Sequence, residues 1–258
     1  METLKMENVS ISYGEKFIIK NINFQLRKGE IISIVGESGS GKSTILNSIL
    51  GFLPEEGKIQ NGEIYYEGKK ITCLSKKEWQ ILRGKKIGII FQEPGSTLNP
   101  FQKIGKQFFE SFHHVLKMKK KEARTLMENM FSKVGLKGTE ELIEKFPFQL
   151  SGGMKQRVSI ALAIGLGPNL LLADEPTSSL DATIQKNIIE EFLFLKKELN
   201  MSILLVTHNL ALAKYVSDKI LVLSQGNMVD FGSPEEIIQN PKSEYTKKLL
   251  SDIPKIKE

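Results

Sequence analysis

The most informative segment of this 258-residue chain is Gly36-Glu37-Ser38-Gly39-Ser40-Gly41-Lys42-Ser43. It matches the pattern G-x-x-x-x-G-K-[ST], in which glycines let backbone N–H groups curl around phosphate oxygens. A continuous apolar run at 30–35 precedes it, and an apolar segment of helical period at 43–50 follows, with Gly51 placed as its C-cap. Strand, loop and helix are the context that this motif needs, so we predict a phosphate-binding loop. In it, Lys42 reaches the β- and γ-phosphates and Ser43 ligates Mg²⁺. The alternative is a chance glycine-rich loop.

The rest of the chain alternates strand-like and helical segments around this loop. Helical periodicity dominates 101–167, where Ala123, Met127 and Met130 share one face, and it returns at 182–199. Such alternation implies an α/β fold, with a mainly parallel sheet covered by helices and a helical insert. The strands are expected at 4–13, 17–26, 30–35, 87–91, 170–173, 203–206 and 220–223.

A second candidate site follows the apolar run at 170–173, which ends in Asp174-Glu175-Pro176. A carboxylate at the end of a buried strand can hold Mg²⁺, so Asp174 is the candidate metal ligand. Glu175 points elsewhere and could orient and deprotonate the attacking water. The alternative is an ordinary acidic turn at a strand end. The presence of a phosphate-loop motif in the same chain favours the Mg²⁺ site over this alternative.

Composition narrows the class of protein. The net charge is +6, and lysines recur in small groups, which would suit nucleic acid; interspersed acidic residues favour a solvated surface instead. A single cysteine, Cys73, allows no disulfide within the chain and no cysteine-based metal cluster. We expect no secretory leader, and no apolar run approaches the ~20 residues of a membrane helix. Any connection to a membrane is therefore expected to run through a partner protein.

One further motif distinguishes among phosphate-loop nucleotidases. Leu150-Ser151-Gly152-Gly153-Met154 resembles the LSGGQ signature of ABC ATPases, with Met154 in place of the usual glutamine. The resemblance implies that Ser151, Gly152 and Gly153 open a helix whose N-terminus caps the ATP held by a partner subunit. A plain helix N-cap by Ser151 is the alternative.

The resemblance extends to other positions, each of which also has an ordinary structural reading. Tyr13 resembles the aromatic residue that stacks on adenine, and Gln92 the glutamine that senses Mg²⁺ and couples to the membrane subunit. Asp181 resembles a residue of the loop that crosses the dimer interface, and His208 the histidine that contacts the γ-phosphate. The implied catalytic residues are Glu175, His208, Gln92 and Lys42. The implied metal ligands are Ser43, Gln92 and Asp174. The implied ATP-binding residues are Tyr13, Gly36, Ser38, Gly39, Ser40, Gly41, Lys42, Ser43, Thr44, Ser151, Gly152, Gly153 and Asp181.

A finer resemblance points to the ATPases of dipeptide, oligopeptide and nickel importers. It rests on the segment 92–100, on Met154 and on the tail around Tyr245-Thr246. It implies one domain over 1–258, an RecA-like P-loop NTPase fold with an N-terminal antiparallel β portion and an inserted ABC helical subdomain. The core is expected at 1–95 and 168–231, the helical subdomain at 96–167 and a tail at 232–258.

The resemblance also implies partners. These are membrane-spanning permease subunits, a second, related ATPase subunit rather than another copy, and, indirectly, an extracytoplasmic substrate-binding protein. The place of work would be the cytoplasmic face of a bacterial membrane, with ATP and Mg²⁺ as ligands and no nucleic acid. Two other classes share these motifs. DNA-repair ATPases usually carry a coiled coil or zinc modules, and ABC translation factors normally hold two ATPase units in one chain.

Overall fold

The structure is a computed structural model that describes residues 1–93, 97–177 and 182–252. The chain divides into two compact units. The first unit comprises Met1–Trp79 and Lys196–Glu258, and the second comprises Gln80–Leu195.

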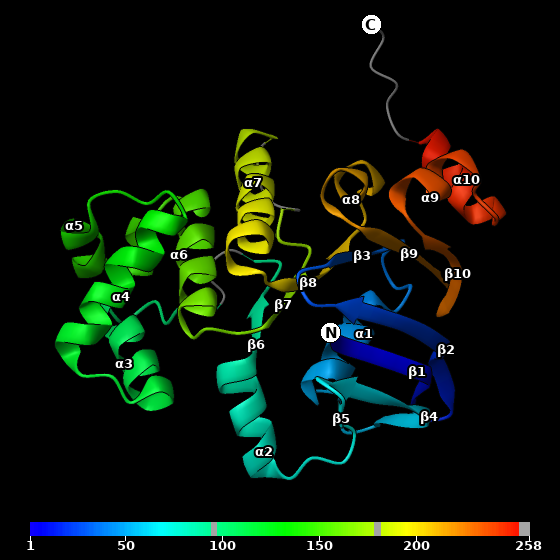
Figure 1. The fold of residues 1–258 in the computed structure, drawn as a ribbon, viewed down its shortest axis with the longest axis horizontal. Helices are drawn as coiled ribbons and strands as arrows, with labels where there is room; N and C mark the ends of the chain where they lie inside the picture. Colours follow the sequence, from blue (N-terminus) through cyan, green and yellow to red (C-terminus); the bar gives the residue numbers. More distant parts are fainter. Residues whose placement is uncertain (94–96, 178–181, 253–258) are drawn as a thin grey trace, which may run out of the picture. The chain divides into compact units, whose positions relative to one another are not determined.

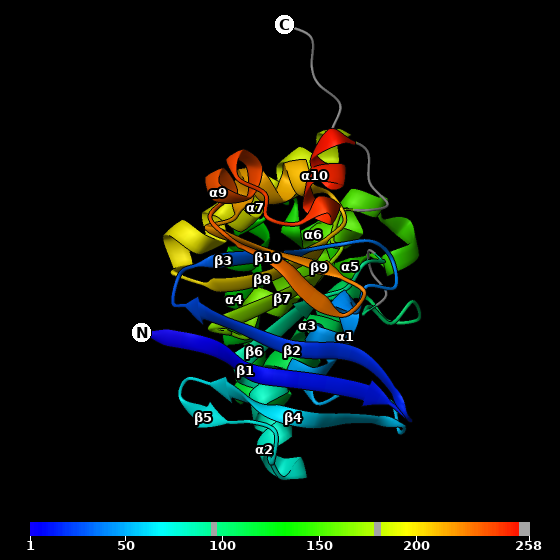
Figure 2. The same ribbon diagram turned by 90° about the vertical axis from the view of Figure 1, so that its right-hand side faces the viewer.

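The first unit is built on a sheet that is antiparallel at one end and mainly parallel at the other. Its strands follow the order β5-β4-β1-β2-β10-β9-β3-β8. The long β1 and β2 pair antiparallel, whereas the fully buried β3 pairs parallel with both β8 and β9. Figure 2 shows β4, β1 and β2 lying next to one another. The bounds are β1 (Glu2–Tyr13), β2 (Lys16–Arg27), β3 (Ile31–Val35), β4 (Gly57–Tyr66), β5 (Lys69–Lys70), β8 (Ser202–Thr207), β9 (Lys219–Ser224) and β10 (Asn227–Gly232).

Short helices cover this sheet. Helices α8 and α9 pack on β3 and β9 through a core that includes Val35, Leu210 and Ile237. Figure 1 shows α8, α9 and α10 above the ribbons of β9 and β10, on one face of the sheet. The bounds are α1 (Lys42–Leu50), α2 (Lys76–Ile81), α8 (Leu210–Val216), α9 (Pro234–Gln239) and α10 (Glu244–Ser251).

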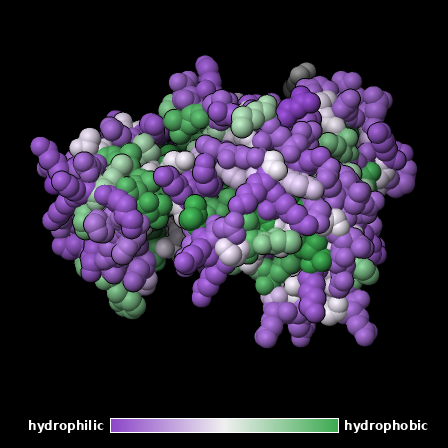
Figure 3. Space-filling model, turned by 60° about the horizontal axis from the view of Figure 1, so that its bottom comes forward, coloured by the Kyte–Doolittle hydropathy of each residue, from purple (hydrophilic) through white to green (hydrophobic). Residues whose placement is uncertain are grey.

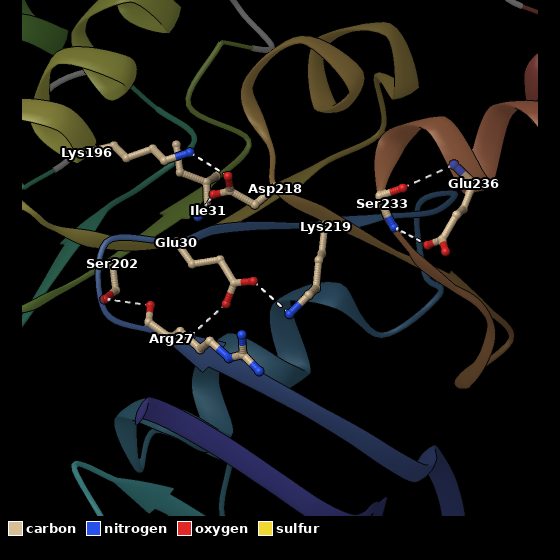
Figure 4. A network of polar contacts seen from close by, with 9 residues as sticks. All are labelled: Arg27, Glu30, Ile31, Lys196, Ser202, Asp218, Lys219, Ser233 and Glu236. Atoms are coloured by element: carbon tan, nitrogen blue, oxygen red, sulfur yellow. Dashed lines mark hydrogen bonds and ion pairs between the residues drawn. The ribbon is translucent and has the colours of Figure 1, made fainter. Parts of the chain in front are cut away.

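A polar network fixes the amino-terminal ends of the parallel strands (Figure 4). The carboxylate of Asp218 accepts the backbone N–H of Ile31 at 2.7 Å and pairs with Lys196 at 2.6 Å. Glu30 pairs with Lys219 at 2.7 Å. These contacts hold the amino-terminal ends of β3 and β9 in place. The phosphate loop follows the carboxyl end of β3, so it is attached to a strand that is fixed at its start.

The second unit contains two parallel strands and the helical part of the chain. Ile90 of β6 pairs with Ala173 of β7. Phe108, Phe112 and Phe131 form edge-to-face aromatic pairs in the core of the helical part. Its elements are β6 (Ile87–Ile90), α3 (Ile104–Leu116), α4 (Lys120–Lys133), α5 (Thr139–Glu144), α6 (Gly152–Gly165), β7 (Leu170–Asp174) and α7 (Ala182–Leu199), which runs four residues into the first unit.

Most predicted elements are present, and the α/β fold class is confirmed. The predicted helix 43–50 is α1, and Gly51 ends it in the left-handed conformation that favours glycine. On α4, the predicted face of Ala123, Met127 and Met130 is buried. Sequence reasoning missed β4, β5, β10, α2 and α8. The predicted subdomain limits at 96 and 167 stay a prediction.

The surface carries few large hydrophobic side chains among charged ones. The face drawn in Figure 3 is mostly hydrophilic, with hydrophobic patches between the polar side chains. In the described part of the chain, no helix combines the length and the apolar character that crossing a bilayer requires.

Candidate functional site

The predicted phosphate loop connects the carboxyl end of β3 to the amino end of α1. Gly39 and Gly41 have φ values of +80° and +104°, a region that other residues rarely adopt. A Cβ on Gly41 would also lie 2.4 Å from the side chain of Ile19. The backbone conformation therefore favours glycine at both positions. At Gly41 the space beside Ile19 favours glycine as well.

Lys42 folds back over its own loop. Its ammonium donates to the carbonyl oxygens of Gly36 at 2.8 Å and Glu37 at 2.9 Å, and its side chain is buried. A lysine held this way presents a fixed positive charge at the amino end of a helix whose first turn contains no acidic residue. The arrangement suits an anion.

Tyr13 and Thr44 lie beside the loop. The hydroxyl groups of the two residues are 3.1 Å apart, which joins the end of β1 to the first turn of α1. Ser38, Gly39 and Ser43 are exposed. The hydroxyl of Ser40, in contrast, is buried and has no hydrogen-bond partner among the described residues.

His208 lies at the same edge of the sheet as the loop. Val35 pairs with Thr207 across the parallel strands β3 and β8, so Gly36 and His208 each follow the last paired residue of neighbouring strands. His208 is exposed. The strand register thus brings the predicted γ-phosphate contact next to the predicted phosphate loop.

In the second unit, as in the first, predicted site residues follow the carboxyl ends of two neighbouring parallel strands. Ile90 pairs with Ala173 across β6 and β7, so Gln92 and Asp174 emerge at one edge of that strand pair. Glu175 has a φ of 43°, in the left-handed region that non-glycine residues seldom occupy. Such backbone strain costs about 1–3 kcal/mol and is concentrated at functional sites. The left-handed φ ends the extended conformation of β7 directly after Asp174. A role for Glu175 separate from that of Asp174 stays a prediction.

The predicted signature segment opens helix α6. Ser151 is its N-cap and accepts the backbone N–H of Met154 at 3.3 Å. Ser151 and Gly152 are exposed, whereas Gly153 is buried, and the first turn contains no acidic residue. Ser151 therefore acts as an N-cap, as the structural alternative predicted. This cap leaves the amino end of α6 available to an anion.

Sequence reasoning gave no role to Gln156, which lies on the same helix. Its side-chain amide is buried and donates to the carbonyl oxygen of Pro176 at 3.1 Å. It therefore ties the signature helix to the segment just after Glu175. A polar side chain on the buried face of an apolar helix was the available signal.

Arg157 and Glu191 form a second link, between α6 and α7. Arg157 Nε lies 3.1 Å from a carboxylate oxygen of Glu191. Burial raises the pKa of Glu191 to about 7, although the positive charge of Arg157 opposes the shift. The other carboxylate oxygen of Glu191 has no partner among the described residues.

The donors present fit ATP and Mg²⁺. The loop offers a helix N-terminus, a fixed ammonium and a buried, unpartnered serine hydroxyl, which suit phosphate oxygens. The implied metal ligands Ser43, Gln92 and Asp174 offer only oxygen donors, the type that Mg²⁺ prefers. Within residues 1–93, 97–177 and 182–252, no three histidine, cysteine or acidic residues are grouped so that they could hold a metal ion.

The structure gathers the predicted site residues into two groups. Tyr13, the loop and His208 belong to the first unit; Gln92, Asp174, Glu175 and the segment at Ser151 belong to the second. Asp181 lies outside the described residues.

Comparisons with known proteins agree with these features. A family described as ABC transporter matches residues 19–178. The oligopeptide transport ATP-binding protein OppD of Bacillus subtilis is 42% identical over 97% of the chain and 72% of its own length. The dipeptide transport ATP-binding protein DppD of the same organism is 38% identical over 99% of the chain and 78% of its own length.

Solved structures show the same fold. The ATP-binding cassette MJ0796, in a dimeric post-hydrolysis state bound to ADP and Pi, gives a TM-score of 0.78 at 31% identity, over 90% of this chain and 98% of its own. CbiO1 of Clostridium perfringens, part of an ABC transporter complex, gives 0.82 at 29% identity, over 98% and 96%. The phosphate loop, the strained glutamate and the serine-capped helix thus occur in a chain of matching sequence and fold, and this chain belongs to the ABC transporter family as an ATP-hydrolysing, ATP-binding cassette.

Proposed function

We propose that this chain powers an importer for peptides, working under membrane-spanning permease subunits at the cytoplasmic face of a bacterial membrane. The observation that carries the proposal is the match, over nearly the whole chain, to ATP-binding proteins named for oligopeptide and dipeptide transport. An extracytoplasmic binding protein would select the cargo, because the described site offers features for phosphate and not for a peptide.

Each group of residues would contribute to binding or hydrolysing ATP. Lys42, Ser40 and the amino end of α1 would hold the phosphates, with Tyr13 near the adenine. The helix N-terminus at Ser151 would cap the ATP of the partner subunit, so that two ATP molecules lie between two subunits. In-line attack on a phosphate is limited mainly by positioning and charge, which helix N-termini and lysine supply.

Hydrolysis would proceed by attack of a water molecule on the γ-phosphorus. Glu175 would accept a proton from that water while the bond to the leaving ADP breaks, and His208 would contact the γ-phosphate. Ser43, Gln92 and Asp174 would hold Mg²⁺, which neutralises phosphate charge when bound.

Exposed aromatic side chains support a protein partner. Phe52 in the first unit and Phe101 in the second are 52% and 86% exposed. Large exposed hydrophobic side chains are the usual anchors of protein interfaces. Phe101 directly follows the segment after Gln92, where the resemblance implies contact with a permease.

Reconstitution tests the cargo. The chain would be reconstituted in vesicles with the permease subunits encoded by neighbouring genes, the partner ATPase and the binding protein. ATP hydrolysis would then be measured in the presence of a peptide or of a nickel chelate. Hydrolysis stimulated by the peptide supports the proposal. Stimulation by the nickel chelate alone would show that the cargo is a metal complex and not a peptide. Co-purification with ribosomes or nucleic acid, rather than with membrane extract, would reject the transporter role.

A further inference from the structure

The tail of the chain reaches the phosphate loop through Tyr245. The backbone N–H of Glu37 donates to the hydroxyl oxygen of Tyr245 at 2.9 Å, although the two residues are 208 positions apart. Glu37 lies inside the loop, and Tyr245 lies in the first turn of α10. Both residues belong to the first unit.

Glu37 also holds the lysine of the loop. Its carbonyl oxygen accepts the ammonium of Lys42 at 2.9 Å and the backbone N–H of Ser40 at 3.2 Å. One residue therefore uses its N–H to bind the tail and its C=O to bind the loop's cation. The orientation of Glu37 is consequently set from outside the loop.

The amino end of α10 is itself firmly anchored. The carboxylate of Asp230, on β10, accepts the backbone N–H groups of Lys242 at 3.1 Å and Ser243 at 3.0 Å, and the hydroxyl of Thr246. Burial raises the pKa of Asp230, but these hydrogen bonds outweigh burial and lower the pKa below its usual value. An ionised carboxylate at a helix N-terminus is stabilising.

Neighbouring elements add to this anchorage. Ser243 caps α10 by accepting the N–H of Thr246 at 3.0 Å. Helix α9, just before it, starts with a reciprocal pair of contacts between Ser233 and Glu236 (Figure 4). Tyr245 is thus presented from a fixed helix.

Packing places the ring independently of the hydroxyl. Tyr245, Leu249 and Leu250 pack on the core cluster that includes Val35, the residue directly before the loop. Burial raises the pKa of Tyr245, so the phenol is neutral at physiological pH when it accepts the N–H of Glu37. Ring packing and hydrogen bonding can therefore be separated by mutation.

We propose that Tyr245 is a positioning residue for ATP: its hydroxyl fixes Glu37, which in turn fixes the ammonium of Lys42. Without that hydroxyl, the loop must be ordered when the nucleotide binds, so affinity falls. The inference rests on the proposed assignment of the loop to the phosphates of ATP.

The test measures Mg-ATP affinity of the full chain by isothermal titration, together with thermal unfolding. Tyr245→Phe keeps the ring and removes the hydroxyl, so we expect the Kd to rise about three- to tenfold, with the Tm within ~2 °C of the wild type. Leu249→Ala removes packing only, so we expect a lower Tm and a Kd within about twofold of the wild type. Tyr215→Phe, on the exposed side of α8, is the matched control and should change neither quantity.

Amide hydrogen exchange adds a direct readout. Tyr245→Phe should accelerate exchange in a peptide covering 36–42 but leave a peptide from β8 unchanged. A wild-type Kd and wild-type exchange in Tyr245→Phe would overturn the proposal, and so would an equal loss of affinity in Leu249→Ala. If Lys42→Ala binds Mg-ATP normally, the assignment of the loop itself fails, whatever Tyr245 does.

Discussion

The ammonium of Lys42 lies 2.8 Å from the carbonyl oxygen of Gly36, at the start of its own loop. The lysine therefore does not extend into solvent, where it would have to be ordered each time a nucleotide binds. Its position is prepared by the loop that surrounds it, and preorganised charges cost little reorganisation on binding.

Lys42→Ala should lose this charge and weaken Mg-ATP binding by about 10- to 100-fold or more, since hydrogen bonds to charged groups contribute about 1.5–3 kcal/mol. Isothermal titration measures the loss. Lys214→Ala, on the exposed face of α8, is the control and should bind normally. Unchanged affinity in Lys42→Ala would remove the lysine from the site.

Glu175→Gln should retain ATP binding and lose hydrolysis by ~10²–10⁴-fold, the usual contribution of a general base. Phosphate release and nucleotide binding are measured on the same preparation. Because glutamine keeps the shape and the backbone strain of the residue, the Tm should stay within ~2 °C of the wild type. Turnover near the wild-type rate would mean that another group activates the water, and His208→Ala would be the next variant.

Glu191 should make stability depend on pH. Its pKa of about 7 exceeds the ordinary value of 4.5, so between these values the folded chain holds a proton that the unfolded chain releases. This contribution is complete below about pH 4.5 and is lost as the pH rises through about 7.

Glu191→Gln is neutral at every pH and can still accept from Arg157. Its advantage over the wild type should therefore grow by about 1–3 kcal/mol between pH 5 and pH 8.5, seen as several degrees of Tm. Glu190→Gln, an exposed neighbour on α7, should show no such trend. A Tm difference independent of pH would show that Glu191 is ionised throughout.

A cysteine at Phe101 should crosslink to a permease subunit in the assembled transporter. The exposed native Cys73 must first be replaced by serine. Phe101 is 86% exposed, whereas Leu98, which is 5% exposed, is too buried to report a contact. Glu128→Cys, exposed on α4, is the control. Crosslinks from Phe101→Cys only to soluble proteins would count against a transporter role.

The partner ATPase should be a related chain and not a second copy. The reason is the methionine form of the signature at Met154, which resembles one member of a paired set. By light scattering, Glu175→Gln with ATP and Mg²⁺ should stay largely monomeric at micromolar concentration and dimerise when the partner is added. A stable ATP-dependent homodimer would reject the heterodimer while leaving the family assignment intact.

The features that the sequence predicts are those encoded locally. The loop and α1 follow from a contiguous motif, and the left-handed Gly51 follows from a helix end. Strand β10 pairs antiparallel with β9 across the turn at Gln225 and Gly226. It was missed because its buried residue is the charged Asp230, so no apolar alternation marks the strand.

Contacts between distant residues were also missed. Tyr245 stood in a family-like tail, but its partner is a backbone N–H, which every residue except proline possesses. Nothing in the sequence distinguishes Glu37 as that partner. The strained φ of Glu175 likewise follows from its surroundings, because glutamate itself disfavours this conformation.

Strand β5 has a consequence for how this chain avoids aggregation. It ends the sheet of the first unit with two exposed residues, Lys69 and Lys70, each paired with a glutamate. An edge strand with free backbone groups invites another chain to add to the sheet, and a very short, lysine-bearing edge discourages this. The edge at β5 is therefore a poor template for filament growth by strand addition.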